Sequence, residues 1–137
     1  MDGLTRISMT IEESLLKQFD RLTKAEGFPT RSEAIGHLIR GALVERQWES
    51  DAEVAGVITI IYDHHKSQLL KKLVEAQHDS GSLVLCSQHA HLDHNNCLEN
   101  IVVRGRAEAV KKLHQNLSAI KGIKHAALSM TTLGRNF

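Results

Sequence analysis

The sequence predicts an α+β protein in two parts, a β-α-α segment at residues 1–49 and a βαββαβ domain at residues 54–132. Three observations support this fold class. Residues 5–11 alternate between apolar and polar side chains, which is typical of a half-buried strand. Two amphipathic stretches with helix-start signatures follow before residue 49. Beyond residue 54, apolar strands and striped helices succeed one another in the order of the ferredoxin-like split βαβ arrangement.

The strand at residues 5–11 is expected to pair with the same strand of another copy, because one strand is not stable alone and no second strand precedes residue 54. Its apolar face would lie on the helices. Its outward face carries three polar residues, Arg6, Ser8 and Thr10. A two-stranded ribbon fits the major groove of DNA, where arginine suits guanine and hydroxyls suit base edges or phosphates. The alternative is a strand that serves only as a dimerisation edge.

Two capping boxes predict where the two N-terminal helices begin, Thr10 with Glu13 and Thr30 with Glu33. Gly27 ends the first helix. The second is expected to reach about residue 48. This part is too small to fold alone and is expected to dimerise.

The C-terminal part follows a polar joint at residues 49–53. It predicts strands at residues 54–62, 83–91, 97–104 and 123–131, and helices at residues 64–78 and 107–120. An open sheet with both helices on one face is expected.

Metal-binding side chains concentrate between residues 78 and 97, which hold four of the nine histidines and both cysteines. His89 and His91 are two positions apart on a predicted strand and therefore point to the same face. Cys97 follows a short polar turn, and from the neighbouring antiparallel strand its thiolate can point toward the same place. Imidazole and thiolate bind late transition metals. Cys86 is expected to point to the opposite face, as a small core residue.

The chain resembles two known modules in a known order. Residues 5–48, including the run Arg31-Ser32-Glu33-Ala34-Ile35, look like a ribbon-helix-helix DNA-binding domain. The motifs Gln77-His78, His89-x-His91 and Asp93 to Glu99 resemble the ACT-like metal-binding domain of the nickel-responsive regulator family (NikR). The resemblance implies a Ni(II)-responsive transcriptional regulator that binds a palindromic DNA operator and represses nickel-uptake genes.

The same resemblance implies a homotetramer, a dimer of dimers around a core of metal-binding domains. It implies a square-planar nickel site made by His89, His91 and Cys97 of one subunit with His78 of another. It also suggests orienting roles around these ligands for Tyr62, Gln77 and Glu99.

A second cation site implied by the resemblance is doubtful here. Glu33 matches one of its two carboxylate positions, but His37 occupies the other, and hard cations prefer oxygen ligands. His64 and His65 could hold surplus metal, although solvated surface roles are favoured for both.

Composition excludes little. The net charge is +1, and 42% of residues are hydrophobic, so no general affinity for nucleic acid is indicated. The sequence has neither a membrane-length apolar run nor a signal-peptide pattern, so a cytoplasmic protein is expected.

The rival functions are a zinc or copper sensor, and a small-molecule regulator with an incidental metal site. An enzyme is not expected, because a four-ligand site leaves no open position. An antitoxin-like role would not need the C-terminal domain.

Overall fold

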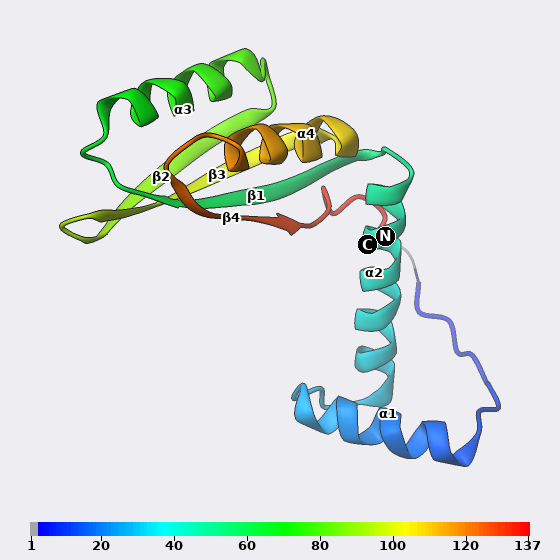
Figure 1. Ribbon diagram of the computed structural model, residues 1–137. Coiled ribbons are helices and arrows are strands. Elements are labelled where there is room, and N and C mark those ends of the chain that lie inside the picture. Colours follow the sequence, from blue (N-terminus) through cyan, green and yellow to red (C-terminus); the bar gives the residue numbers. More distant parts are fainter. Residues whose placement is uncertain (1–2) are drawn as a thin grey trace. The chain divides into compact units, whose positions relative to one another are not determined.

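The computed structural model describes residues 3–137, which form a mixed α+β chain (Figure 1). Within these residues it has four helices and one four-stranded antiparallel sheet. In chain order the elements are α1 (Glu13–Ala25), α2 (Arg31–Glu49), β1 (Glu53–Tyr62), α3 (Ser67–Asp79), β2 (Val84–Asp93), β3 (Asn96–Arg106), α4 (Ala107–Ser118) and β4 (Ile123–Met130). The chain divides into two compact units between Gly41 and Ala42, within α2.

Residues 5–11 carry no strand in the single chain. A strand needs a hydrogen-bonded neighbour, and the sequence offers these residues only the same segment of a second copy. The β-ribbon therefore stays a prediction.

Of the two capping boxes predicted for the helices of the first unit, one is present and the other is not. The N–H of Glu33 donates to Thr30 Oγ1 at 3.2 Å, so the second predicted cap is confirmed. The first is wrong, because α1 starts after Glu12 and has no side-chain capping hydrogen bond. Gly27 makes the turn after α1 with a φ of 76°, a conformation that glycine adopts at little cost.

An ion pair joins the two helices of this unit. Arg31 donates from Nε and Nη2 to the two carboxylate oxygens of Asp20, at 2.8 and 2.9 Å. The Arg31 hydrogen bond holds the pKa of Asp20 below its usual value. The pair is exposed, so its main effect is to orient the start of α2 against α1.

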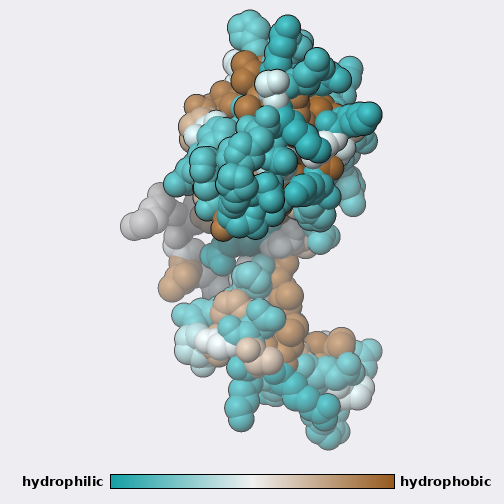
Figure 2. Space-filling view, turned by 60° about the vertical axis from the view of Figure 1, so that its left-hand side comes forward, coloured by the Kyte–Doolittle hydropathy of each residue, from teal (hydrophilic) through white to brown (hydrophobic). Residues whose placement is uncertain are grey.

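The first unit leaves a large apolar surface uncovered. Figure 2 shows hydrophobic side chains, in brown, at the surface of its helices. They line an open groove of about 710 Å³ that includes Met9, Ile11, Leu15, Leu16, Phe19, Leu22, Ile35 and Leu38. Exposed apolar patches of this kind mark interaction surfaces.

The second unit is a sheet in the order β2-β3-β1-β4, with every neighbouring pair antiparallel. This is the predicted βαββαβ arrangement. Alternate residues of β1 and β3 are buried beneath α3 and α4, and Ile58, Ile60, Ile101 and Val103 form the centre of the core. The other face carries no helix (Figure 1). Cys86 lies on the edge strand β2 and is exposed, so its predicted core role is wrong.

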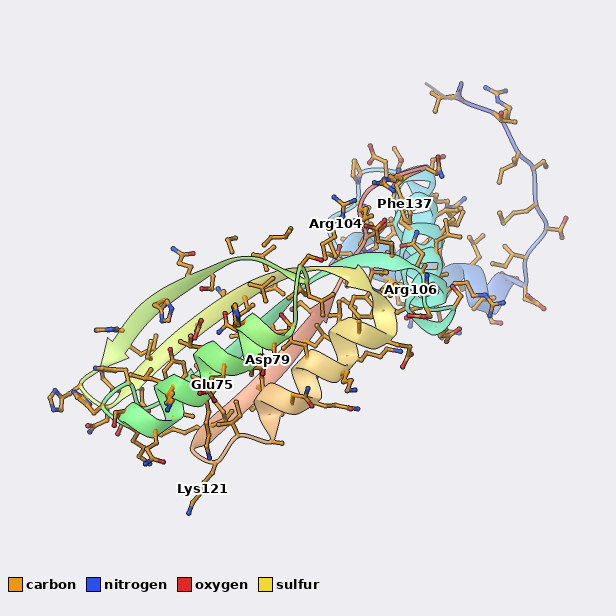
Figure 3. The ribbon with its side chains drawn as sticks, turned by 90° about the horizontal axis from the view of Figure 1, so that it is seen from above. Glu75, Asp79, Arg104, Arg106, Lys121 and Phe137 are labelled. Carbon is orange, nitrogen blue, oxygen red and sulfur yellow. The ribbon has the colours of Figure 1, made fainter. Side chains whose placement is uncertain are left out.

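The predicted polar joint at residues 49–53 is held by hydrogen bonds. Trp48 is buried, and its Nε1 donates to the carbonyl oxygen of Thr131 at 2.9 Å. Arg104 and Arg106, at the end of β3 (Figure 3), donate to Glu53 and Asp51. The last turns of α2 therefore belong structurally to the second unit.

None of the helices in residues 3–137 combines the length and the apolar composition that crossing a membrane requires.

Candidate metal centre

Three of the four predicted ligands lie on one face of the sheet. His91 is the cross-strand neighbour of Cys97, and His89 is that of Glu99. Cys97 and Glu99 are buried on the helix-covered face, with 1% and 2% of their surface exposed. Because direct cross-strand neighbours point to the same side, His89 and His91 project to that face as well. The edge position of β2 keeps their rings accessible.

The turn between β2 and β3 sets this register. Asp93 Oδ1 accepts the backbone N–H of Asn95 at 2.8 Å, and both carboxylate oxygens accept from the side-chain amide of Asn96. These bonds, the Asn96 amide foremost, hold the pKa of Asp93 below its usual value. The carboxylate thus closes a tight reversal that places the end of β2 beside the start of β3.

A buried polar network joins His89 to the centre of the sheet. The Tyr62 hydroxyl donates to Glu99 Oε2 at 3.0 Å, and Gln77 Nε2 donates to Glu99 Oε1 at 3.1 Å. The Tyr62 oxygen also lies 3.2 Å from His89 Nδ1. The three residues suggested as orienting groups are therefore joined through Glu99, and two of them, Tyr62 and Glu99, lie close to the predicted ligand His89.

This network defines how His89 presents its ring. Burial, and then the charge of Glu99, raise the pKa of Tyr62, so the phenol keeps its proton at neutral pH. Because that proton is donated to Glu99, the Tyr62 oxygen can only accept from a protonated Nδ1 of His89. His89 Nε2 lies 3.4 Å from Glu99 Oε1. Both ring nitrogens of His89 therefore face the network, Nδ1 toward Tyr62 and Nε2 toward Glu99.

The four predicted ligands do not meet within one chain. Among residues 3–137, no three of His78, His89, His91 and Cys97 bring their donor atoms within 4.8 Å of one another. His78 is exposed in the last turn of α3. Cys97 Sγ faces the carbonyl oxygen of Leu98 at 3.8 Å.

A row of four imidazoles lies beside this face. The sequence singled out His64 and His65 as possible ligands of surplus metal, but it did not place them beside His91 and His94. The His64 ring stacks on the His91 ring, with centroids 4.4 Å apart and planes at 10°. His64 also contacts His65, which contacts His94 in the turn after β2. Burial, and then neighbouring His65 and His91, lower the pKa of His64. The sequence signal was the run Asp63-His64-His65 directly after a buried strand.

The other predicted sites lie in the first unit. Arg6, Ser8 and Thr10 are exposed in the segment before α1. His37 packs against Phe28, with ring centroids 5.0 Å apart, and Glu33 belongs to the helix cap described above. Neither residue belongs to a three-donor cluster among residues 3–137.

Known proteins resemble this chain over nearly its whole length. Residues 55–131 match the family model of the NikR C terminal nickel binding domain. A "Putative nickel-responsive regulator" from Solidesulfovibrio magneticus is 47% identical, covering 98% of both chains. Proteins of the same name from Syntrophus aciditrophicus and Thermococcus onnurineus are 45% and 44% identical, covering 98% and 96% of both chains.

A solved structure supports the fold alone. The uncharacterized protein TM1266 from Thermotoga maritima superposes with a TM-score of 0.52 at 14% sequence identity. It covers 57% of this chain and 96% of its own.

Proposed function

The chain belongs to the nickel-responsive regulator family, and on that premise we propose the site and the assembly through which it responds to Ni(II). It is a regulator and not an enzyme, and Ni(II) is its metal. The proposed nickel ligands are His89, His91 and Cys97 of one chain with His78 of another. The observation that carries this assignment is the cross-strand register that sets His91 against Cys97 on one face.

The residues present fit the metal. Three imidazoles and one thiolate are donors that suit square-planar Ni(II). When bound, the ion would supply a cross-link between chains, because His78 is exposed at the end of α3 and joins no three-donor cluster with the other ligands in its own chain. Tyr62, Gln77 and Glu99 would orient His89, as groups behind a ligand commonly do.

The N-terminal unit is proposed as a ribbon-helix-helix dimer at residues 1–49, followed by the metal-binding domain at residues 54–132. A second copy is the proposed occupant of the apolar groove. Support comes from Ile7 and Met9, on the apolar face of the alternating segment. Their side chains are 67% and 59% exposed in the single chain, so this face has no cover there. Covering these residues with the partner strand would turn Arg6, Ser8 and Thr10 toward the DNA major groove.

Two copies of this dimer would join through their metal-binding domains into a homotetramer. The helix-free face of the sheet and the exposed edge strand β2 are surfaces that such an assembly could cover. Nickel-dependent repression of nickel-uptake genes from a palindromic operator is the proposed output. Glu33 and His37 remain the candidates for a second cation, with His37 leaving its oxygen ligation incomplete.

The test is a Ni(II) titration of the full-length chain followed by optical absorption. We expect a thiolate-to-nickel charge-transfer band that saturates at one ion per chain and disappears in Cys97→Ala. Cys86→Ala is the matched control, because it removes the exposed thiol and should leave the band unchanged.

Two outcomes would contradict the proposal. Tight one-to-one binding of Zn(II) or Cu(II) with no square-planar nickel spectrum would indicate a sensor of another metal. A band that survives in Cys97→Ala and vanishes in Cys86→Ala would show that the ligand assignment is wrong.

A further inference from the structure

Asp51 ends helix α2 in a backbone conformation that favours glycine. Its φ is 53°, in the left-handed region. It lies in the turn where the N–H of Ala52 donates to the carbonyl oxygen of Gln47 at 3.0 Å. Glycine is the usual residue at such a helix end, because it adopts this conformation without a steric penalty. Aspartate gives up that advantage, and its side chain makes contacts that glycine could not.

The Asp51 side chain caps the start of a different helix. Oδ1 accepts the backbone N–H of Glu108 at 2.9 Å, and Oδ2 accepts from Nε of Arg106, which ends β3 (Figure 3), at 3.1 Å. Glu108 is the second residue of α4, so its N–H has no partner within the helix, and Arg106 at the N-cap position makes no side-chain cap. These contacts, the Glu108 N–H first, hold the pKa of Asp51 below its usual value. The Arg106 side chain is exposed, so the capping bond matters more than the ion pair.

Helix α4 in turn caps the end of α2. Lys111 Nζ donates to the carbonyl oxygen of Trp48, in the last turn of α2, at 3.2 Å. The backbone N–H of Ala107 donates to the carbonyl oxygen of Ala52, just after α2, at 2.9 Å. Each helix therefore satisfies backbone groups that the other leaves without a partner.

This junction lies at the far end of a strand that begins at the proposed nickel site. Strand β3 starts beside Cys97 and ends at Arg106, where α4 follows directly. The buried faces of β3 and α4 belong to one apolar core, which leaves little room for independent movement. A change at the start of β3 therefore has a continuous packed route to the end of α2.

We propose that Asp51 is a positioning residue for nickel-dependent DNA binding, which fixes the direction in which α2 leaves the second unit by holding the end of α2 on the start of α4. The covalent connection between the two units is α2 itself, since they meet between Gly41 and Ala42. This inference rests on the proposed function, because that direction affects the output only if nickel controls DNA binding.

The experiment compares full-length Asp51→Gly with the wild-type chain. Glycine suits the backbone conformation at the end of α2 and removes only the side-chain contacts. Nickel affinity is measured by competition with a chelator. DNA affinity is measured, with and without Ni(II), on a duplex selected from a random-sequence pool by the nickel-loaded wild-type chain. We expect nickel to raise the DNA affinity of the wild type by about 5–150-fold, and that of Asp51→Gly by about twofold or less, at unchanged nickel affinity.

Matched variants separate this role from a general effect on stability. Asp51→Asn keeps an oxygen for the Glu108 N–H and should retain most of the gain. Lys111→Met removes the reciprocal bond to Trp48 and should reduce the gain, which provides a second test should Asp51→Gly fail to fold. Glu53→Gln is the control, because Glu53 accepts from Arg104 in the same joint but links two strands of the sheet, so the gain should not change.

The possible results are distinct. A purely structural Asp51 would weaken DNA binding equally with and without nickel and leave the gain intact, which would overturn this inference and not the proposed function. Loss of the nickel charge-transfer band in Asp51→Gly would also overturn it, because Asp51 would then act on metal binding itself. A wild-type chain with no nickel-dependent gain would overturn the proposed function and this inference together. Faster amide exchange at Glu108 in Asp51→Gly, together with a lost gain, would support it.

Discussion

At the scale of single residues, Tyr62 shows how the burial of the Glu99 carboxylate can cost little folding stability. A carboxylate taken out of water destabilises the fold unless its oxygens accept hydrogen bonds. Glu99 is 2% exposed and accepts one bond from Tyr62 and one from Gln77. Because Tyr62 also contacts His89, the same hydroxyl serves both the stability of the core and the orientation of a proposed ligand.

Tyr62→Phe should therefore weaken stability and nickel binding together. Losing the donor leaves a buried acceptor half satisfied, which costs about 1–3 kcal/mol in the free energy of unfolding. The freed His89 ring should lower nickel affinity by about 10–100-fold. Denaturant unfolding of the metal-free chain and competition with a chelator measure the two effects.

Thr59→Val is the matched control for this substitution. It removes a hydrogen bond of similar length, 2.8 Å from Thr59 Oγ1 to Asn100 Oδ1, between the same two strands on the other face of the sheet. It should change stability and leave nickel affinity unchanged. Equal losses of nickel affinity in both variants would mean that Tyr62 acts through the fold alone.

The residues around the site were predictable to different degrees. Tyr62, Gln77 and Glu99 could be named from the family resemblance, and they are joined through Glu99. The stacking of His64 on His91 could not, because it depends on how a loop after β1 meets the edge strand β2. Local spacing carries no information about such a meeting.

At the scale of elements, β1 has a requirement for glycine that its hydrophobic pattern hides. A Cβ on Gly56 would lie 2.8 Å from the carbonyl oxygen of Ser129 and 3.5 Å from Trp48 Cη2. The absence of a side chain lets β4 and the indole both approach the strand. Trp48 in turn fixes the last turn of α2, through its bond to Thr131.

Gly56→Ala should destabilise the chain by about 1–3 kcal/mol, because the strand or the indole must move to admit the methyl group. Trp48 is the single tryptophan of the sequence, so its emission should shift to longer wavelength as it loses burial. Gly41→Ala is the control. It meets nothing within 4 Å in helix α2, and should stabilise the chain by about 1 kcal/mol. Unchanged stability and emission in Gly56→Ala would refute this packing argument.

The pattern of elements shows what local sequence can and cannot specify. Alternation and helical stripes predicted all the strands and helices of the second unit. The central strands and both helices bury one face within the same chain, and β2 and β4 pair with those strands. The strand at residues 5–11 did not form, because its partner would be another molecule. The cap at Thr10 failed because a helix start depends on backbone geometry as well as residue type.

At the scale of the whole molecule, the proposed regulation is a linkage between metal and DNA. Nickel changes operator affinity only if it prefers the arrangement of the tetramer that binds DNA. A coupling free energy of about 1–3 kcal/mol would change that affinity by about 5–150-fold. Donation of His78 from a second chain is what would make metal binding sensitive to that arrangement.

Mixing two inactive variants tests this donation. His78→Ala and Cys97→Ala chains each lack one ligand at every site, so neither alone should give the charge-transfer band. When the two variants are unfolded and refolded together, part of the band should return. Some sites would then take His78 from a Cys97→Ala chain and the other three ligands from a His78→Ala chain. No recovery despite mixed assembly would place all four ligands within one chain. Mixing His78→Ala with His78→Ala carrying Cys86→Ala is the negative control.

The apolar groove of the first unit bears on how much of this protein a cell must hold. A unit that exposes leucine, isoleucine and methionine side chains gains much of its stability from association, so its folded fraction rises with the number of copies present. At low concentration the chains would stay monomeric and open to proteolysis, whereas at high concentration they would be dimeric and long-lived. Gene dosage would then set a threshold for regulation before any nickel is present.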